Sequence, residues 1–271
     1  MRMPSIVKST LFAAAATLLA TSAAVAGPFT VPGGGQIKTT ENSYEGLVTK
    51  PGDVLHGIFN VSQINGPGGI TYSYGAGGQY LVGVFDGFLL TSITPTAPSF
   101  LEPLGGFDLA FSGGSLKYYT YGSDIFAGNA LTDGSGSQQD AIDAITLGGG
   151  TLELSLTPQT IFGTTTLGIH VPTDLTTFTG AATTTVFLDI VGGASASLFD
   201  KDTFVNAFTL ALADATYQGS ANSTTCFTGR WQVCGDNHAT LRVIPEPVTL
   251  SLFGAGLAGA AALRRRKAKK A

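Results

Sequence analysis

Residues 107–115 read FDLAFSGGS, a short pattern that decides how the body of this chain is interpreted. Phe107, Leu109 and Phe111 alternate with polar or small residues. Successive side chains of a strand point to opposite faces, so apolar residues at every second position indicate a strand with one buried face. The glycine pair that follows favours a turn. This stretch therefore predicts a strand that ends at a turn.

The same alternation recurs along the chain, and no long segment keeps a helical apolar period. Glycine-rich turn signals separate the apolar runs. This spacing predicts an all-β fold, an antiparallel β-sandwich or jelly roll, with residues 27–243 as one domain. Two short helices are expected, at 137–145 and at 200–206. Four further sets of alternating residues predict strands: Leu55, Gly57, Phe59 and Val61; Leu152, Leu154 and Leu156; Phe204, Phe208, Leu210 and Leu212; and Ala239, Leu241 and Val243.

Residues 1–26 have the composition of a secretory signal peptide. Arg2 and Lys8 form a charged head, residues 11–20 an apolar core, and AVA at 24–26 a small-residue cleavage site. Such a segment implies the Sec translocon and signal peptidase as partners. The alternative is an N-terminal membrane anchor, but the apolar core is shorter than the roughly 20 residues of a spanning helix.

The charge of the body differs from that of the whole chain, which is −4. Two of the 14 basic residues lie in the signal segment and six lie after Leu263, whereas 17 of the 18 acidic residues lie between the two ends, which leaves a net charge of −11 there. Binding to nucleic-acid phosphates requires clustered Lys and Arg, so nucleic acid is not expected as a partner.

The C-terminal segment, residues 244–271, joins three unlike pieces. Pro245-Glu246-Pro247 comes first, an uncharged run of 16 residues follows at 248–263, and a basic block begins with Arg264, Arg265 and Arg266. As a helix the run would span about 24 Å, and flanking basic side chains can extend its reach. By the positive-inside rule the basic block stays cytoplasmic, which predicts a C-terminal transmembrane helix in the inner membrane.

This order of features resembles the PEP-CTERM sorting signal of Gram-negative bacteria. The resemblance implies processing near Pro245-Glu246-Pro247 by an exosortase, a membrane cysteine transpeptidase. The inner membrane would then hold the chain only transiently, before it reaches the cell surface or the extracellular matrix. Proteins with this signal tend to come from bacteria that make extracellular polysaccharide, and are linked with biofilm or floc formation. The alternative is a permanent membrane anchor.

Cys226 and Cys234 are the two cysteines of the chain. A close pair in an exported protein usually forms a disulfide, which we predict here. Metal binding would need more ligands at set spacing than this pair offers.

No sequence pattern predicts catalysis, a bound metal or a cofactor. His56, His170 and His238 are each isolated, and neither a nucleophile motif nor a nucleotide-binding glycine pattern is present. Six aspartates are candidate calcium ligands, but none follows a known calcium pattern: Asp124, Asp133, Asp140, Asp143, Asp200 and Asp202. A carboxylate pair brought together by folding is the remaining route to an enzyme, one acting on carbohydrate.

Five aromatic residues suggest a binding surface. If their segments are strands, Tyr72 and Tyr74 share one face and Tyr119 and Tyr121 another, while Trp231 lies between the cysteines. Exposed aromatic rows stack on sugar rings, but such rows are also common in sheet cores. The leading hypothesis is a non-catalytic surface or matrix protein that associates with exopolysaccharide, and the alternative is a secreted carbohydrate-active enzyme.

Overall fold

The computed structural model describes residues 27–31, 34–98, 105–133, 136–172, 182–199, 201–222 and 230–244. Within these ranges the chain is mostly β, with one α-helix, α2 (Gln138–Thr146), and three short 3-10 turns, η1 (Ala76–Gly78), η2 (Ala127–Asn129) and η3 (Ala196–Leu198). The strands are β1 (Gly35–Glu45), β2 (Val54–Gly66), β3 (Gly69–Ser73), β4 (Tyr80–Thr96), β5 (Gly106–Tyr121), β6 (Thr151–Pro158), β7 (Leu167–Val171), β8 (Ala182–Gly192), β9 (Phe204–Val205), β10 (Leu212–Ala213), β11 (Ala215–Asn222) and β12 (Val233–Val243).

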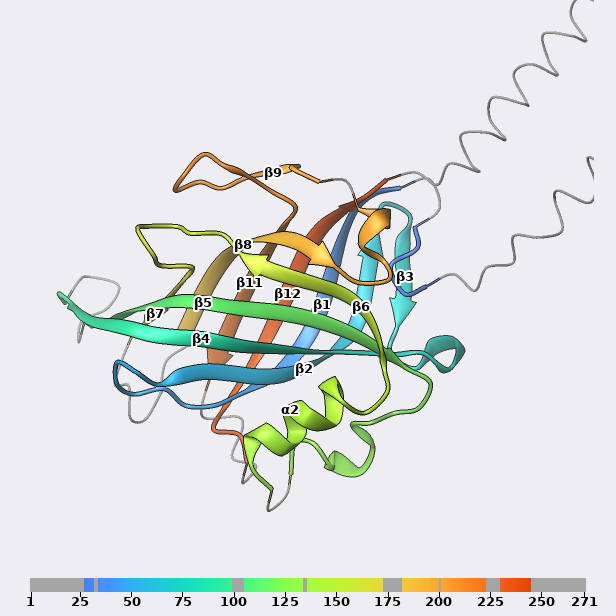
Figure 1. Ribbon diagram of the computed structural model, residues 1–271, viewed down its shortest axis with the longest axis horizontal. Helices are drawn as coiled ribbons and strands as arrows, with labels where there is room; N and C mark the ends of the chain where they lie inside the picture. The colour runs from blue at the N-terminus through green and yellow to red at the C-terminus, as the bar shows by residue number, and fades with distance from the viewer. Residues whose placement is uncertain are drawn as a thin grey trace, which may run out of the picture.

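The main sheet closes on itself to form an eight-stranded antiparallel barrel (Figure 1). The strand order is β1-β12-β11-β8-β6-β5-β4-β2, and β1 pairs with β2 to close the ring. Closure leaves no free edge among these strands, which protects the sheet from pairing with other chains. The predicted all-β class is confirmed, but the predicted sandwich is wrong. A sandwich and a barrel share the same alternation, and only the β1–β2 pairing distinguishes them.

One position of the barrel wall is shared by two short strands. β6 pairs with the C-terminal half of β5, and β7 pairs with its N-terminal half. Both also pair with β8, although β7 does so only at Ile169 and His170. The loop 159–166 therefore interrupts what would otherwise be one continuous strand of the barrel wall, and it lies on the outer side of the barrel.

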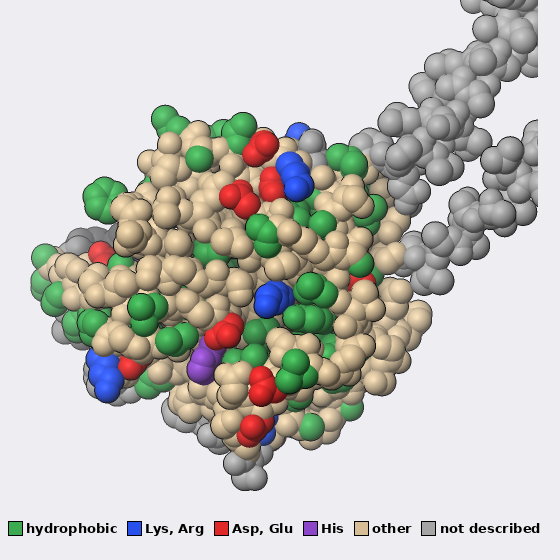
Figure 2. Space-filling view, in the orientation of Figure 1, with side chains coloured by type: hydrophobic (Ala, Val, Ile, Leu, Met, Phe, Trp, Pro, Cys, Tyr) green, Lys and Arg blue, Asp and Glu red, His purple; other side chains and the backbone are tan. Residues whose placement is uncertain are grey.

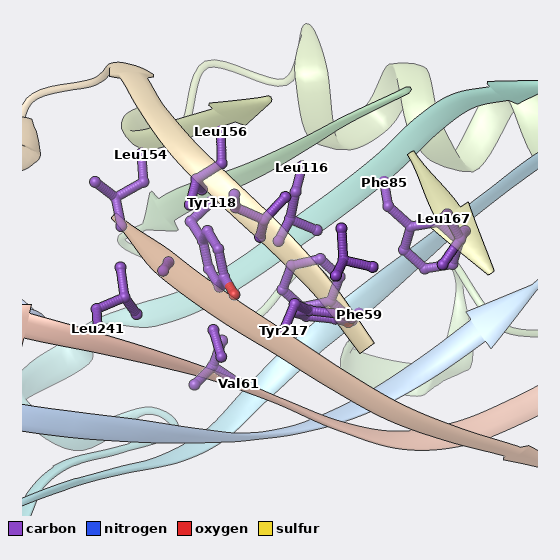
Figure 3. Close-up of a cluster of buried hydrophobic side chains, with 14 of the residues drawn as sticks. Phe59, Val61, Phe85, Leu116, Tyr118, Leu154, Leu156, Leu167, Tyr217 and Leu241 are labelled. Atoms are coloured by element: carbon purple, nitrogen blue, oxygen red, sulfur yellow. The ribbon is translucent and has the colours of Figure 1, made fainter. Parts of the chain in front are cut away.

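The barrel interior holds the main hydrophobic core, to which side chains converge from strands around the ring (Figure 3). Phe29 and Phe199 close the end where Gly35 pairs with Val243, and the ring of Phe29 packs edge-on against Tyr118. At the opposite end, Glu45 pairs with Val233. The two ends thus differ, because aromatic rings close one of them.

Glycines on the inner face make room for large aromatic rings. A Cβ atom at Gly83 would collide with the ring of Phe59 and would lie 2.6 Å from the Lys117 carbonyl oxygen. A Cβ atom at Gly57 would collide with the ring of Phe85 in the same way. Pairing large rings with glycine on the facing strand lets the barrel interior fill without backbone distortion.

Helix α2 covers part of the outer surface of the barrel, beneath β2 and β4 in the view of Figure 1. Ser137 caps it, since its side chain accepts a hydrogen bond from the Asp140 amide and the Asp140 carboxylate accepts one from the Ser137 amide. Ile142 and Ile145 are buried in a second apolar cluster between helix and barrel. The predicted helix at 137–145 is confirmed.

Several local predictions need correction. The glycine pair after Phe111 is not a turn: β5 runs through it, and Gly113 and Gly114 adopt positive φ angles that bend the strand. The helix expected at 200–206 is wrong, because Phe204–Val205 pairs with Leu212–Ala213 as the β9–β10 hairpin. The strand face predicted from Phe208, Leu210 and Leu212 is also wrong, because these three side chains are exposed.

The prediction that Leu152 shares a face with Leu154 and Leu156 is also wrong. The register of β5 against β6 shifts between Tyr118 and Tyr119, which pair with Leu154 and Leu152 and leave Glu153 as an extra residue. Such a bulge reverses the side-chain direction on either side of it. Leu154 therefore lies in the barrel core, whereas Leu152 packs in the outer cluster under α2.

Candidate functional site

Four of the five aromatic residues proposed for sugar contact are buried. Tyr72, Tyr119, Tyr121 and Trp231 expose 8% of their surface or less, and only Tyr74 is partly exposed. They therefore form no exposed aromatic row. Tyr119, Tyr121 and Trp231 belong to the cluster under α2, and Tyr72 belongs to the barrel core.

The polar atoms of these side chains hold the fold together. The Tyr72 hydroxyl accepts a hydrogen bond from the Leu81 amide at 2.7 Å, and the Trp231 indole donates to the Leu131 carbonyl at 2.9 Å. The Tyr74 hydroxyl donates to the Asp124 carboxylate at 2.6 Å, and burial, reinforced by this contact, raises the pKa of Tyr74 well above its usual range. These bonds match the alternative interpretation of the aromatics as structural residues.

The aspartates considered for calcium are dispersed. Asp124 accepts from Tyr74, Asp140 caps α2, and Asp143 accepts a hydrogen bond from Gln139. Asp133 accepts one from Asn129, Asp202 donates its amide to Asp214, and Asp200 lies outside the described residues. Within the described ranges, no three His, Cys, Asp or Glu side chains lie together in a way that could hold a metal ion.

The three histidines stand apart from one another on the outside of the barrel. His56 bonds Gln138 at 2.8 Å and His238 bonds Gln218 at 2.9 Å. His170 lies 2.7 Å from the Asp108 carboxylate, with both side chains partly exposed. Charged groups are sparse on the face seen in Figure 2, where they lie in small separate groups among uncharged side chains. The Asp108–His170 pair is therefore a local polar feature of the outer wall.

This pair lines an outer groove of about 320 Å³, to which β5, β7 and β8 contribute. Thr183 and Thr185 of β8 lie along it, and Ile161 and Phe208 lie at its apolar side. Phe208 is 63% exposed and packs edge-on against Phe187. The groove thus combines a carboxylate, an imidazole, two hydroxyls and an accessible aromatic ring.

Two loops that border the groove are fastened together. The Gln159 side-chain amide donates to the Leu212 carbonyl at 2.6 Å, and the Asn206 amide donates to the Gln159 side chain at 3.2 Å. Asn206 is fully buried. This bonding fixes the β9–β10 hairpin, which carries Phe208, against the loop that carries Ile161.

A second polar site lies inside the barrel, on β1. Ile37, Thr39, Glu41 and Ser43 are buried with alternating exposed neighbours, and Glu45 continues the row. The Glu41 carboxylate accepts hydrogen bonds from Thr39 at 2.5 Å and from Tyr118 at 2.8 Å. Burial raises the pKa of Glu41 to about 7, against the opposing effect of these hydrogen bonds.

Glu45 lies nearer the other end of the barrel, where it pairs with Val233 and which Phe29 and Phe199 do not close. Its carboxylate accepts a hydrogen bond from Ser43 at 2.9 Å and faces the Asn237 side chain. Burial raises its pKa to about 7 as well. Tyr217 lies near both glutamates, and its hydroxyl is close enough to the Glu41 carboxylate to lower the pKa of Glu41, although neither that hydroxyl nor Oε2 of Glu41 has a hydrogen bond of good geometry to a described residue.

Two small cavities adjoin Glu45, with volumes of about 50 and 40 Å³. Both are partly open, and each is lined mainly by apolar side chains. Five residues line both cavities: Glu45, Leu55, Ile169, Thr184 and Asn237.

The sequence analysis missed the interior glutamates. Their signal was present in the alternation of residues 37–45, where Ile37, Thr39, Glu41, Ser43 and Glu45 occupy every second position. A polar residue in that pattern is ordinarily assigned to the solvent face, so the row was not interpreted as an inward one.

The predicted disulfide and sorting residues lie mostly outside the described residues. Cys234 is on β12, but Cys226 is not described, so the disulfide stays a prediction. Residues 1–26, Pro245-Glu246-Pro247 and Arg264 to Arg266 are also outside. The barrel extends to Val243, after which the Ile244 amide donates to the Leu198 carbonyl at 2.8 Å. Of the described helices, none has the length and apolar character needed to cross a membrane.

The comparisons with known proteins place the C-terminus in a class of exported, sorted proteins. Residues 243–267 match the PEP-CTERM protein-sorting motif. The chain therefore carries this motif, which implies export, processing by exosortase and sorting to the cell surface. No curated protein matches the chain, and no solved structure matches it.

Proposed function

We propose that this protein is a non-catalytic component of the cell surface or extracellular matrix that associates with exopolysaccharide. The observation that carries the proposal is the outer groove on a barrel whose last strand leads directly into the sorting motif. The barrel supplies a rigid wall, and the motif supplies the route to the surface.

The chemistry of the groove suits a sugar. The exposed face of Phe208 can stack on a pyranose ring, as aromatic rings at binding sites do. Asp108 can accept hydrogen bonds from sugar hydroxyls, while Thr183 and Thr185 can both donate and accept. A few convergent polar groups beside apolar surface are typical of small-ligand sites.

A non-catalytic role is favoured over the enzymatic alternative. The two carboxyl groups that β1 turns toward the barrel interior, Glu41 and Glu45, are four residues apart on this strand, which places their Cα atoms about 13 Å apart. Glycosidase carboxyl pairs lie roughly 5–10 Å apart and flank an accessible bond. Glu41 is fully buried in the core, where no sugar ring has access.

Binding is tested by co-sedimentation of the exported protein with exopolysaccharide from its host. We expect Phe208→Ala and Asp108→Asn to weaken binding by about tenfold each, because each removes one of the groove's recognition groups. Leu210→Ala is the matched control, since Leu210 is 77% exposed on the same hairpin and does not line the groove. Equal binding by all four proteins would contradict the assignment of the groove.

The cellular role is tested separately by deleting the gene and measuring flocculation and biofilm mass. We expect a loss of matrix cohesion that the unaltered gene restores and Phe208→Ala does not. An unchanged matrix, together with purified protein that ignores the polysaccharide, would refute the proposed function.

A further inference from the structure

The barrel interior contains acidic groups without basic partners. Glu41 is fully buried, and the Glu45 side chain adjoins it along β1. No Lys, Arg or His among the described residues is buried, and the ion pairs within those ranges involve Asp86 and Asp108 instead. Buried charges in proteins are ordinarily paired, so this arrangement is unusual.

Open space lies beside the acidic groups. The cavity of about 50 Å³ is bordered by the Glu45, Asn237 and Tyr217 side chains on its polar side and by Phe85, Leu167 and Leu188 on its apolar side. The Tyr217 hydroxyl is buried and lies near the Glu41 carboxylate, but it has no hydrogen bond of good geometry to a described residue. Eight-stranded barrels are either filled by their own side chains or hold one small ligand, and this one leaves a polar corner unfilled.

We propose that the barrel interior binds a small apolar molecule that carries a protonated amine, with Glu45 as the partner of its ammonium group. The ammonium group donates to the Glu45 carboxylate, and the Asn237 and Tyr217 oxygens accept its remaining hydrogen bonds. The apolar part contacts Phe85, Leu167 and Leu188. An anion is disfavoured, because it would meet two acidic groups and no basic one.

The route into this site is the end of the barrel away from Phe29 and Phe199. The second cavity, of about 40 Å³, shares Glu45 and Asn237 with the first and reaches Val48 and Val233, near the ends of the strands. Glu45 and Asn237 line both cavities, so a ligand that enters at this end passes beside Glu45.

Three probes with the same chain and different head groups test the proposal: hexylamine, hexanol and hexanoate. Each is titrated into the exported protein by calorimetry and followed by the methyl resonances of Ile169 and Leu188. We expect hexylamine to bind at least about tenfold more tightly than hexanol, and hexanoate not to bind. The Ile169 and Leu188 methyl signals should shift, while those of Ile142 and Ile145 on α2 should not.

Glu45→Gln should weaken hexylamine binding by about tenfold and leave hexanol binding unchanged. Glu153→Gln is the matched control, because Glu153 is also a buried carboxyl but bonds Thr120 and Ser195 and lines neither cavity. If Glu45→Gln fails to fold, the ranking of the three probes and the methyl shifts of the unaltered protein decide the matter. Equal affinity for amine and alcohol, or absence of binding by all three probes, would overturn the proposal.

Discussion

The buried Glu41 carboxyl makes the stability of the barrel depend on pH. Its pKa is about 7 in the folded protein, against an ordinary value of 4.5. Below pH 4.5 the group is protonated in both the folded and the unfolded chain. Between these two values the unfolded chain releases the proton and the folded chain keeps it, so stability falls as the pH rises. Above pH 7 the loss is complete, at about 3 kcal/mol for Glu41 alone.

The replacement Glu41→Gln should remove the contribution of Glu41 to this dependence, while that of Glu45 remains. The Gln oxygen can accept the hydrogen bonds from Thr39 and Tyr118, and its amide can donate to the unbonded Tyr217 hydroxyl. We therefore expect similar melting temperatures for both proteins at pH 4.5. At pH 8 the variant should melt about 6–12 °C higher, since each kcal/mol shifts the melting temperature of a domain this size by about 2–4 °C.

The assay is thermal unfolding of the exported protein by circular dichroism from pH 4.5 to 8. Ile37→Val serves as the control, because Ile37 faces the interior from the same strand and neither titrates nor bonds a titrating group. Its difference from the unaltered protein should be the same at every pH. A Glu41→Gln difference that is equally constant would refute the reasoning, since it would show that Glu41 gains no proton affinity on folding.

Three other predictions follow from the packing and the tail. Gly83→Ala should destabilise the barrel by about 1–3 kcal/mol in denaturant unfolding, because the new methyl group meets Phe59 and the Lys117 carbonyl. Gly122→Ala, at a site surrounded by open space, should be near neutral in the same assay. Ser137→Ala should lower the free energy of unfolding by about 1 kcal/mol, measured as a lower melting temperature, because it removes the cap of α2. Ser155→Ala, at the middle of β6, should lower it by roughly a few tenths of a kcal/mol at most, as expected for a position that is not a cap. Pro245→Ala with Glu246→Ala should leave the tail uncleaved in a host with active exosortase; mass spectrometry of a shortened product from this variant would contradict the assigned recognition site.

The sequence predicted the strands better than it predicted their closure. Leu109 and Phe111, and likewise Phe59 and Val61, lie on inner faces as their alternation indicated. Alternation reports which face is buried, but not which strand pairs with which. The β1–β2 pairing that closes the barrel joins two segments whose spacing is equally compatible with an open sandwich.

The local errors arose where the backbone departs from regular strand geometry. Gly113 and Gly114 bend β5 without ending it, and the extra residue Glu153 moves Leu152 to the outer cluster. The interior site was missed for a different reason. Its acidic residues are stabilised by contacts with Tyr118 and Asn237, which are distant in sequence and come close only when the ring closes.

The firm attachment of Ile244 to Leu198 limits how the protein can be oriented while its tail is in the membrane. Only Pro245-Glu246-Pro247 separates that bond from the predicted apolar anchor. Three fully extended residues span about 10 Å. If the predicted anchor at 248–263 is inserted in the membrane, the end of the barrel that lies nearer the bilayer is the one closed by Phe29 and Phe199. Glu45 and the two cavities beside it would then lie toward the opposite end of the barrel, farther from the membrane, while the tail is still attached.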